Sequence, residues 1–229
     1  MICTLPEQMP RAETLHYLGA GGWQPDAAVD ALLDRAEQAL RHNAAPRAVW
    51  RELPLDQWLP WTEGRCEDGT SCGEDLRRHL AGCCGVLLFA ATLGTGVDRL
   101  LRRLELTDIA LAAVTDAMAG ALLEQVCDAL HRQLQEEHRQ QGRYLTSRFA
   151  PGYGDCPLEL NDEIALLADT VRGCGLTVTP QHLLAPRKST TGIAGVADHP
   201  VTGALAGCAN CKLRQTCAYR KRGTTCASI

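Results

Sequence analysis

The sequence predicts a domain that mixes helices with a few short strands, and three observations support this. From about Thr107 to Gln140, apolar residues recur at intervals of three and four, as in a long amphipathic helix. Val86 to Leu93 is a continuous apolar run bounded by glycines, which is typical of a strand buried on both faces, although a buried helix can show the same run. Ser189 to Val196 alternates polar and small apolar residues, as strands do. The stripe expected to be buried on the long helix is Ile109, Ala112, Ala113, Ala119, Leu123, Val126, Leu130 and Leu134.

The N-terminal third divides into an arm, a helix and a strand. Residues 1–24 contain Pro6, Pro10 and a glycine cluster, which indicate an arm without a long regular element. Residues 25–42 have helical periodicity, with Pro25 suited to the first turn. Residues 48–53 read as a short strand. The connection that follows carries Trp58 and Trp61, which we expect on the surface of the core.

Capping and turn residues predict the shorter elements. Ser71-Cys72-Gly73-Glu74 fits a capping box that opens a helix ending near Gly82. Gly94-Thr95-Gly96 leads into a helix from Val97 to Leu104 and is either a tight turn or an anion cradle. A further helix is predicted over residues 161–172, with Ile164, Leu167, Ala168 and Val171 on its buried face. A strand is predicted over residues 176–179.

Composition excludes several classes of protein. A formal net charge of −4 gives no footprint for nucleic acid. The chain contains no uninterrupted run of 18 apolar residues of the kind that forms a membrane-spanning helix. The first 25 residues lack a secretory pattern, so a cytoplasmic location is expected. The 12 cysteines are therefore expected to be thiols, metal ligands or core residues rather than a disulfide framework.

Residues 198–229 form a separate linker and cysteine-rich tail. Cys208, Cys211, Cys217 and Cys226 are interleaved with lysines and arginines that would offset the charge of thiolates. Four such thiolates can hold zinc or an iron–sulfur cluster. The spacing matches no standard site, so zinc, a cluster and free thiols on a flexible tail all stay open.

The segment from Arg148 to Pro157, Arg-Phe-Ala-Pro-Gly-Tyr-Gly-Asp-Cys-Pro, combines two prolines, two glycines, a cation and an aromatic ring. The prolines exclude a helix interior, and the glycines permit a sharp turn or the close approach of a ligand. This is either a stiff surface connection or a binding loop.

The Arg-x-x-Pro-Gly-Tyr-x-x-Cys-Pro pattern resembles the signature loop of the activation domain of vitamin B12-dependent methionine synthase. A second block, Pro186-Arg187-Lys188-Ser189-Thr190-Thr191-Gly192, resembles the Pro-x-x-Ser-x-Ser-Gly strand of that family, and residues 87–98 resemble its shorter, stand-alone relatives. The resemblance implies an α+β fold for residues 25–197: a mixed or antiparallel sheet flanked by helices, one of them long and central.

The resemblance also implies a binding site for S-adenosylmethionine. It assigns Arg148 to the ligand carboxylate, Tyr153 to a ring near the ligand and the corrin, and the backbone at Ala194 and Gly195 to the adenosyl part. Ala150 and Gly152 belong to the same loop, and Glu124 is a candidate acid on the long helix, where Gly120 occupies the position of one family glutamate. A solvated helix face is the alternative for Glu124.

The implied function is that of a stand-alone reactivation protein, which would bind S-adenosylmethionine and support reductive remethylation of cob(II)alamin on a separate cobalamin-dependent methionine synthase or corrinoid methyltransferase. The chain has no Asp-x-His-x-x-Gly cobalamin signature, so the partner would supply the cobalamin, and the tail could relay an electron. The alternative is a cysteine-rich metal-binding or redox adaptor that keeps the fold without the ligand. A general methyltransferase is disfavoured because the N-terminus lacks a Gly-rich strand-turn-helix fingerprint.

Overall fold

The apolar run predicted as a buried strand forms β2 (Gly85–Thr92), which is buried along its whole length. The computed structural model describes residues 1–58, 73–203 and 215–216. In it β2 pairs with β1 (Arg47–Pro54) on one side and β6 (Ser189–Ala197) on the other, and β3 (Tyr144–Leu145) pairs with the outer side of β6. All three pairings are antiparallel, so the α+β prediction is confirmed with an antiparallel sheet.

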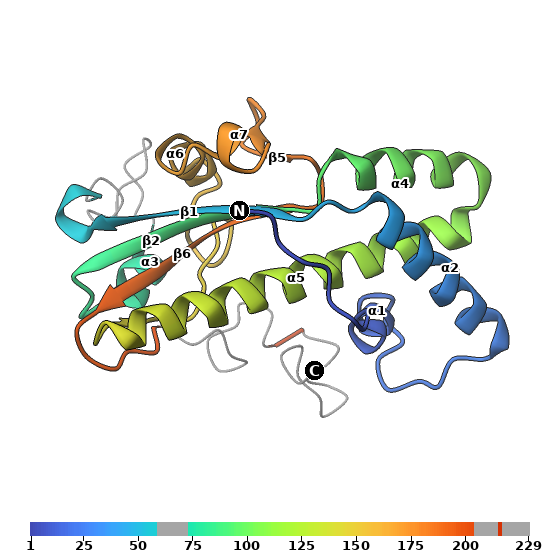
Figure 1. Ribbon diagram of the computed structural model, residues 1–229, viewed down its shortest axis with the longest axis horizontal. Helices are drawn as coiled ribbons and strands as arrows, with labels where there is room; N and C mark the ends of the chain where they lie inside the picture. The colour runs from blue at the N-terminus through green and yellow to red at the C-terminus, as the bar shows by residue number, and fades with distance from the viewer. Residues whose placement is uncertain (59–72, 204–214, 217–229) are drawn as a thin grey trace.

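Helices cover both faces of this sheet (Figure 1). Because side chains alternate along a strand, β2 feeds two cores: Leu87 and Phe89 join the larger one, beneath α5, and Val86 and Leu88 join a smaller one, beneath α6. β6 divides in the same way, with Ala194 in the larger core and Ile193 in the smaller. The continuous apolar run is thus explained by helices on both sides of β2.

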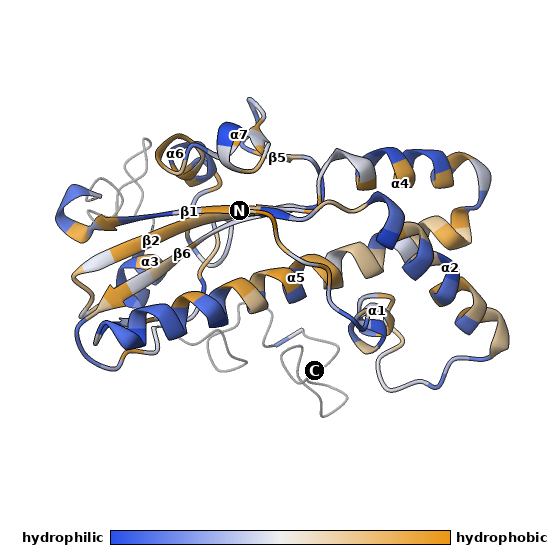
Figure 2. Cartoon of the chain, viewed as in Figure 1, coloured by the Kyte–Doolittle hydropathy of each residue, from blue (hydrophilic) through white to orange (hydrophobic). Residues whose placement is uncertain are grey.

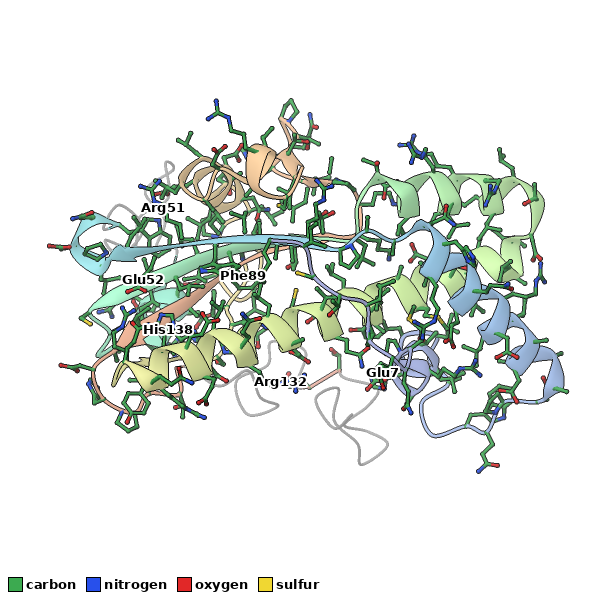
Figure 3. The ribbon with its side chains drawn as sticks, in the orientation of Figure 1. Glu7, Arg51, Glu52, Phe89, Arg132 and His138 are labelled. Atoms are coloured by element: carbon green, nitrogen blue, oxygen red, sulfur yellow. The ribbon has the colours of Figure 1, made fainter. Side chains whose placement is uncertain are left out.

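The long predicted helix is α5 (Ile109–Gln140), which runs along the length of the sheet (Figure 1). The side chain of Asp108 caps it by accepting from the Leu111 amide at 3.0 Å. The prediction for its first two turns is wrong in one respect: Ile109 and Ala113 are exposed, because α5 extends past the sheet there. Polar residues are concentrated in its C-terminal half (Figure 2), where His138 faces Glu52 of β1 at 3.2 Å (Figure 3).

An 18-residue window of α5 is apolar enough to cross a membrane by length and composition, and 56% of it is buried inside the protein. Burial against the sheet and neighbouring helices accounts for this composition. The cytoplasmic location stays a prediction from sequence.

Two helices pack on α5 beyond the sheet. α2 (Ala27–Asn43) is capped by Asp26, whose carboxylate accepts the Ala28 and Val29 amides, so Pro25 lies before the cap and not in the first turn. α4 (Thr95–Thr107) follows the glycine turn. A side chain at Gly96 would place its Cβ 2.2 Å from the Asn43 carbonyl oxygen, so close packing against the end of α2 explains this glycine without an anion.

The N-terminal arm is attached to the domain. It contains a short helix, α1 (Arg11–Tyr17), and its Arg11 forms ion pairs with Asp34 and Glu37 of α2. The Tyr17 ring lies over Gly120 of α5, where a Cβ would be 3.4 Å from the ring. The ring therefore occupies space beside the position at which the resemblance expects a glutamate.

The helix predicted over residues 161–172 is divided in the structure. α6 (Leu160–Leu167) and α7 (Thr170–Gly173) are separated at Asp169, whose φ of 48° is left-handed. Val171 is consequently 61% exposed and not buried as its spacing predicted. The predicted strand at 176–179 is β4 (Thr177–Val178), which pairs with β5 (Leu184–Ala185) in a separate two-stranded sheet.

Two further expectations near the smaller core were wrong. Trp58, at the end of the 3-10 turn η1 (Leu55–Gln57), is fully buried within the smaller core rather than on the surface of the core. The helix predicted to begin with a capping box is α3 (Glu74–His79), whose cap position is Gly73. Glu74 pairs with Arg77 at 2.7 Å instead of reaching back, while Ser71 and Trp61 lie outside the described residues.

Candidate functional site

The site is organised by a bulge in the edge strand that contains Arg148. Leu145 pairs with Val196, and Phe149 bridges Ile193. Three residues of the edge strand (146–148) therefore lie opposite two of β6 (194 and 195), which makes one residue extra. Phe149 turns into the smaller core, whereas Arg148 contacts α5 on the opposite face of the sheet. The bulge thus directs Arg148 towards α5.

Two carboxylates of α5 hold Arg148. Its Nη2 atom is 2.6 Å from Asp128 and 3.2 Å from Glu124. These acids lie four residues apart, on one helix face. The Arg148 side chain is 22% exposed, whereas those of Glu124 and Asp128 are more than half exposed. The guanidinium is therefore half-buried beneath an acidic rim.

A pocket of about 630 Å³ opens beside Arg148. This volume is within the range of sites that hold small organic ligands. Both charged and apolar side chains line it, from α5, the edge strand and the segment after β6: Asp128, His131, Gln135, Arg139, Tyr144, Leu145, Ser147, Arg148, Pro200, Val201 and Thr202.

His131 gives the pocket an uncharged imidazole. Burial, with a smaller contribution from the Arg148 charge, lowers its pKa to about 4. Its Nε2 atom is buried and has no hydrogen-bond partner among the described residues. At neutral pH this nitrogen can form a hydrogen bond with a ligand while the imidazole ring stays uncharged.

The depressed pKa of His131 predicts a stability change with pH. Because the unfolded chain binds a proton near pH 6.5 and the folded chain only near pH 4, stability from this residue is complete above pH 6.5 and is lost as the pH falls towards 4. Between pH 7 and pH 5 we expect a loss of roughly 1–2 kcal/mol. Urea unfolding at both pH values checks this. In His131→Gln the free energy of unfolding should fall less between pH 7 and pH 5, by the share that His131 contributes. An equal fall in the variant and the wild type would contradict this prediction.

The signature loop after Arg148 is closed by its own backbone. The Gly152 amide donates to the Cys156 carbonyl at 2.9 Å, and the Cys156 amide donates to the Tyr153 carbonyl at 3.0 Å. Gly152 has a φ of 82°, which favours glycine. The binding-loop and stiff-connection interpretations both fit this rigid turn.

A tertiary cap fixes the loop to α3. The Asp155 carboxylate accepts the amides of Glu74 at 2.9 Å and Asp75 at 3.0 Å, so it caps a helix some 80 positions away in the chain. Gly154 allows this approach, because a Cβ there would be 2.2 Å from an Asp75 carboxylate oxygen. Asp155 therefore positions the loop. It is not among the binding residues predicted from the sequence.

The predicted residues gather into two groups. Arg148, Glu124, Ala194 and Gly195 lie together at the bulge. Ala194 is buried in the larger core, and Gly195 exchanges hydrogen bonds with Thr146 through both its amide and its carbonyl. The predicted contacts of Ala194 and Gly195 with the adenosyl group stay predictions, and the amide of Gly195 is already occupied.

The loop residues Ala150, Gly152 and Tyr153 lie apart from that pocket. Ala150 lines a different pocket of about 370 Å³, beside α6. The Tyr153 ring is 46% exposed and packs edge-on against Phe149, with ring centroids 5.6 Å apart. Tyr153 lines neither pocket. Neither of these two pockets therefore has both the Arg148 and the Tyr153 side chain in its wall.

The metal prediction concerns Cys208, Cys211, Cys217 and Cys226, all of which lie outside the described residues. Within residues 1–58, 73–203 and 215–216, no group of three or more His, Cys, Asp or Glu side chains could hold a metal ion. Zinc or an iron–sulfur cluster stays a prediction for the tail.

Sequence reasoning missed Asp128 and His131. Both lie on the α5 face that carries Glu124, at spacings of four and seven residues, so helical periodicity from Glu124 would have placed them on that face. The sequence does not show which face of α5 the edge strand contacts.

The fold and the site together define an α+β domain with an acid-clamped arginine beside a pocket. A solved structure with this fold is described as the MetH reactivation domain bound to AdoHcy. It matches at a TM-score of 0.58 and 16% sequence identity, covering 95% of this chain and 82% of that one. No family model matches the chain, and no significant match occurs among curated proteins.

Proposed function

We propose that this protein binds S-adenosylmethionine and supports reductive remethylation of cob(II)alamin on a separate cobalamin-dependent methionine synthase or corrinoid methyltransferase. The observation that carries the proposal is the fold shared with the MetH reactivation domain, in a chain whose Arg148 and Glu124 meet beside a pocket. The bound AdoHcy belongs to that other protein. Here it supports an adenosyl amino acid as the ligand class.

The chemistry of the pocket suits the amino-acid end of such a ligand. A guanidinium binds a carboxylate with two parallel hydrogen bonds, which lysine cannot reproduce. The Glu124 and Asp128 carboxylates lie on the same guanidinium and can accept from an ammonium group. The uncharged His131 adds a hydrogen-bonding group without a further charge.

In the proposed reaction the partner supplies the corrinoid and an external donor supplies one electron, which reduces cob(II)alamin to cob(I)alamin. The methyl group then passes from the sulfonium to cobalt, and a neutral thioether remains. Residues of this chain bind and orient the methyl donor. Titration calorimetry with S-adenosylmethionine tests this first step, and the absence of binding would overturn the proposed function.

The cysteine tail calls for a separate measurement. If it binds a cluster, anaerobically purified protein will be brown and will contain iron, which favours electron transfer to the partner. A colourless protein with one zinc per chain favours a structural tail. If the tail binds no metal and the protein binds no S-adenosylmethionine, both the reactivation role and the metal-binding adaptor are contradicted.

A further inference from the structure

The outer edge of β6 is unpaired in its first half. The edge strand reaches β6 only as far as the bridge between Phe149 and Ile193, whose backbones exchange two hydrogen bonds of 2.8 Å. Because peptide groups alternate in direction along a strand, those of Ser189 and Thr191 point to the same outer edge as that of Ile193. Within the described residues, neither the Ser189 nor the Thr191 amide has a hydrogen-bond acceptor. Residues 189–192 therefore present an open strand edge.

The signature loop leaves this edge open. In the register set by that bridge, Pro151 would lie opposite Thr191. Proline has no amide proton and cannot continue the ladder of hydrogen bonds. The chain makes a β-turn there instead, in which the Tyr153 amide donates to the Ala150 carbonyl at 3.1 Å. The turn ends the edge strand and leaves space beside β6.

The pocket of about 370 Å³ beside α6 lies at this open edge. It is lined by residues 189–191 of β6, by Pro151 and Leu158 of the loop and by Leu183, just before β5. Thr191 is only 2% exposed, so its unpaired amide is a buried donor. Buried donors without an acceptor are rare because they cost free energy. A bound group that supplies an acceptor in this pocket would remove that cost.

We infer that this edge binds an extended peptide segment of a partner protein, which pairs with residues 189–191 as an added strand. An extended peptide offers an amide and a carbonyl on one side at every second residue, about 7 Å apart, and this matches the spacing of the free groups on Ser189 and Thr191. A compact ligand satisfies one of these pairs, whereas an extended peptide satisfies both. The inference goes beyond the proposed function, because it concerns a surface other than the Arg148 pocket.

The pocket walls indicate which side chain the peptide presents. Residues opposite each other on neighbouring strands point to the same face of the sheet. The Thr191 side chain lies on the α6 face, where its hydroxyl donates to the Asn161 side chain at 2.5 Å. The peptide residue opposite Thr191 would therefore contact Leu158 and Leu183. An apolar β-branched residue, valine or isoleucine, fits this position best.

A phage-displayed library of random heptapeptides, panned against the whole protein, tests the inference. The enriched peptides should have a central valine or isoleucine, and calorimetry with one of them as a synthetic peptide gives the dissociation constant. Methylation of its central amide nitrogen removes one hydrogen bond to β6 and should weaken binding about tenfold. In NMR spectra of the complex, the Thr191 amide should exchange with solvent more slowly than in the free protein.

A pair of substitutions separates this edge from other surfaces. Leu183→Asp places a carboxylate in the pocket wall and should weaken peptide binding by about tenfold or more. Leu183 is more than half exposed, so the substitution should not prevent folding. Leu166→Asp is the matched control, because Leu166 is exposed on α6 and lines a different pocket. It should leave the dissociation constant unchanged.

Three results would each overturn the inference. They are the absence of any enriched peptide on the wild type, equal affinity of the peptide and its N-methylated form, and equal affinity of Leu183→Asp and the wild type. None of these results bears on the binding of S-adenosylmethionine, which tests the proposed function separately.

Discussion

Replacing Arg148 by alanine should weaken S-adenosylmethionine binding by about a hundredfold, because the ligand carboxylate loses charge-assisted hydrogen bonds that contribute roughly 1.5–3 kcal/mol each. The substitution also leaves Glu124 and Asp128 without the cation that now holds them. Titration calorimetry of the purified variant measures the change.

Arg148→Lys is the informative companion. It keeps the positive charge but has no planar fork, so we expect it to recover only part of the lost affinity. Residue 148 lies in the edge strand, and the two acids that it faces are more than half exposed. Neither substitution should therefore prevent the protein from folding. Wild-type affinity in Arg148→Ala would remove this residue from the site and with it the main chemical support for the proposed function.

Replacing Asp155 by alanine should lower the free energy of unfolding by about 3 kcal/mol, because two hydrogen bonds that helix amides donate to one carboxylate are lost together. The amides of Glu74 and Asp75 at the start of α3 would then have no cap. Chemical denaturation with urea measures this loss.

The same substitution should weaken ligand binding about tenfold, because the loop that adjoins Arg148 loses its attachment to α3 and Arg148 must then be ordered on binding. Asp155→Asn keeps one acceptor oxygen and should fall between wild type and alanine in both measurements. Asp30→Ala, an exposed acid on α2, serves as the control and should change stability by no more than about 0.5 kcal/mol. Equal stability of Asp155→Ala and wild type would contradict the tertiary cap.

The sequence predicted the elements whose signal is local. The long helix, the strand β2 that is buried on both faces and the alternating strand β6 each follow from the spacing of apolar and polar residues. Errors occurred where a neighbour far along the chain decides the outcome. The cap of α3 comes from Asp155, and the burial of Trp58 depends on the smaller core that α6 covers.

The candidate site divides in the same way. Arg148 and Glu124 were identified from residue type and resemblance, and the structure places them 3.2 Å apart. Asp128 and His131 were missed although they share the helical face of Glu124. The resemblance places Tyr153 near the same ligand, but its ring packs against Phe149 and does not line the pocket beside Arg148.

By itself, the amino-acid sequence determined which segments are helical or extended and which residues can carry charge into a binding loop, because hydrophobic period and side-chain chemistry are properties of neighbouring residues. Only the tertiary structure decided that one extra residue opposite Ala194 turns Arg148 towards two acids of α5. A strand register is fixed by pairing between segments some fifty positions apart, and no local pattern of either segment contains it.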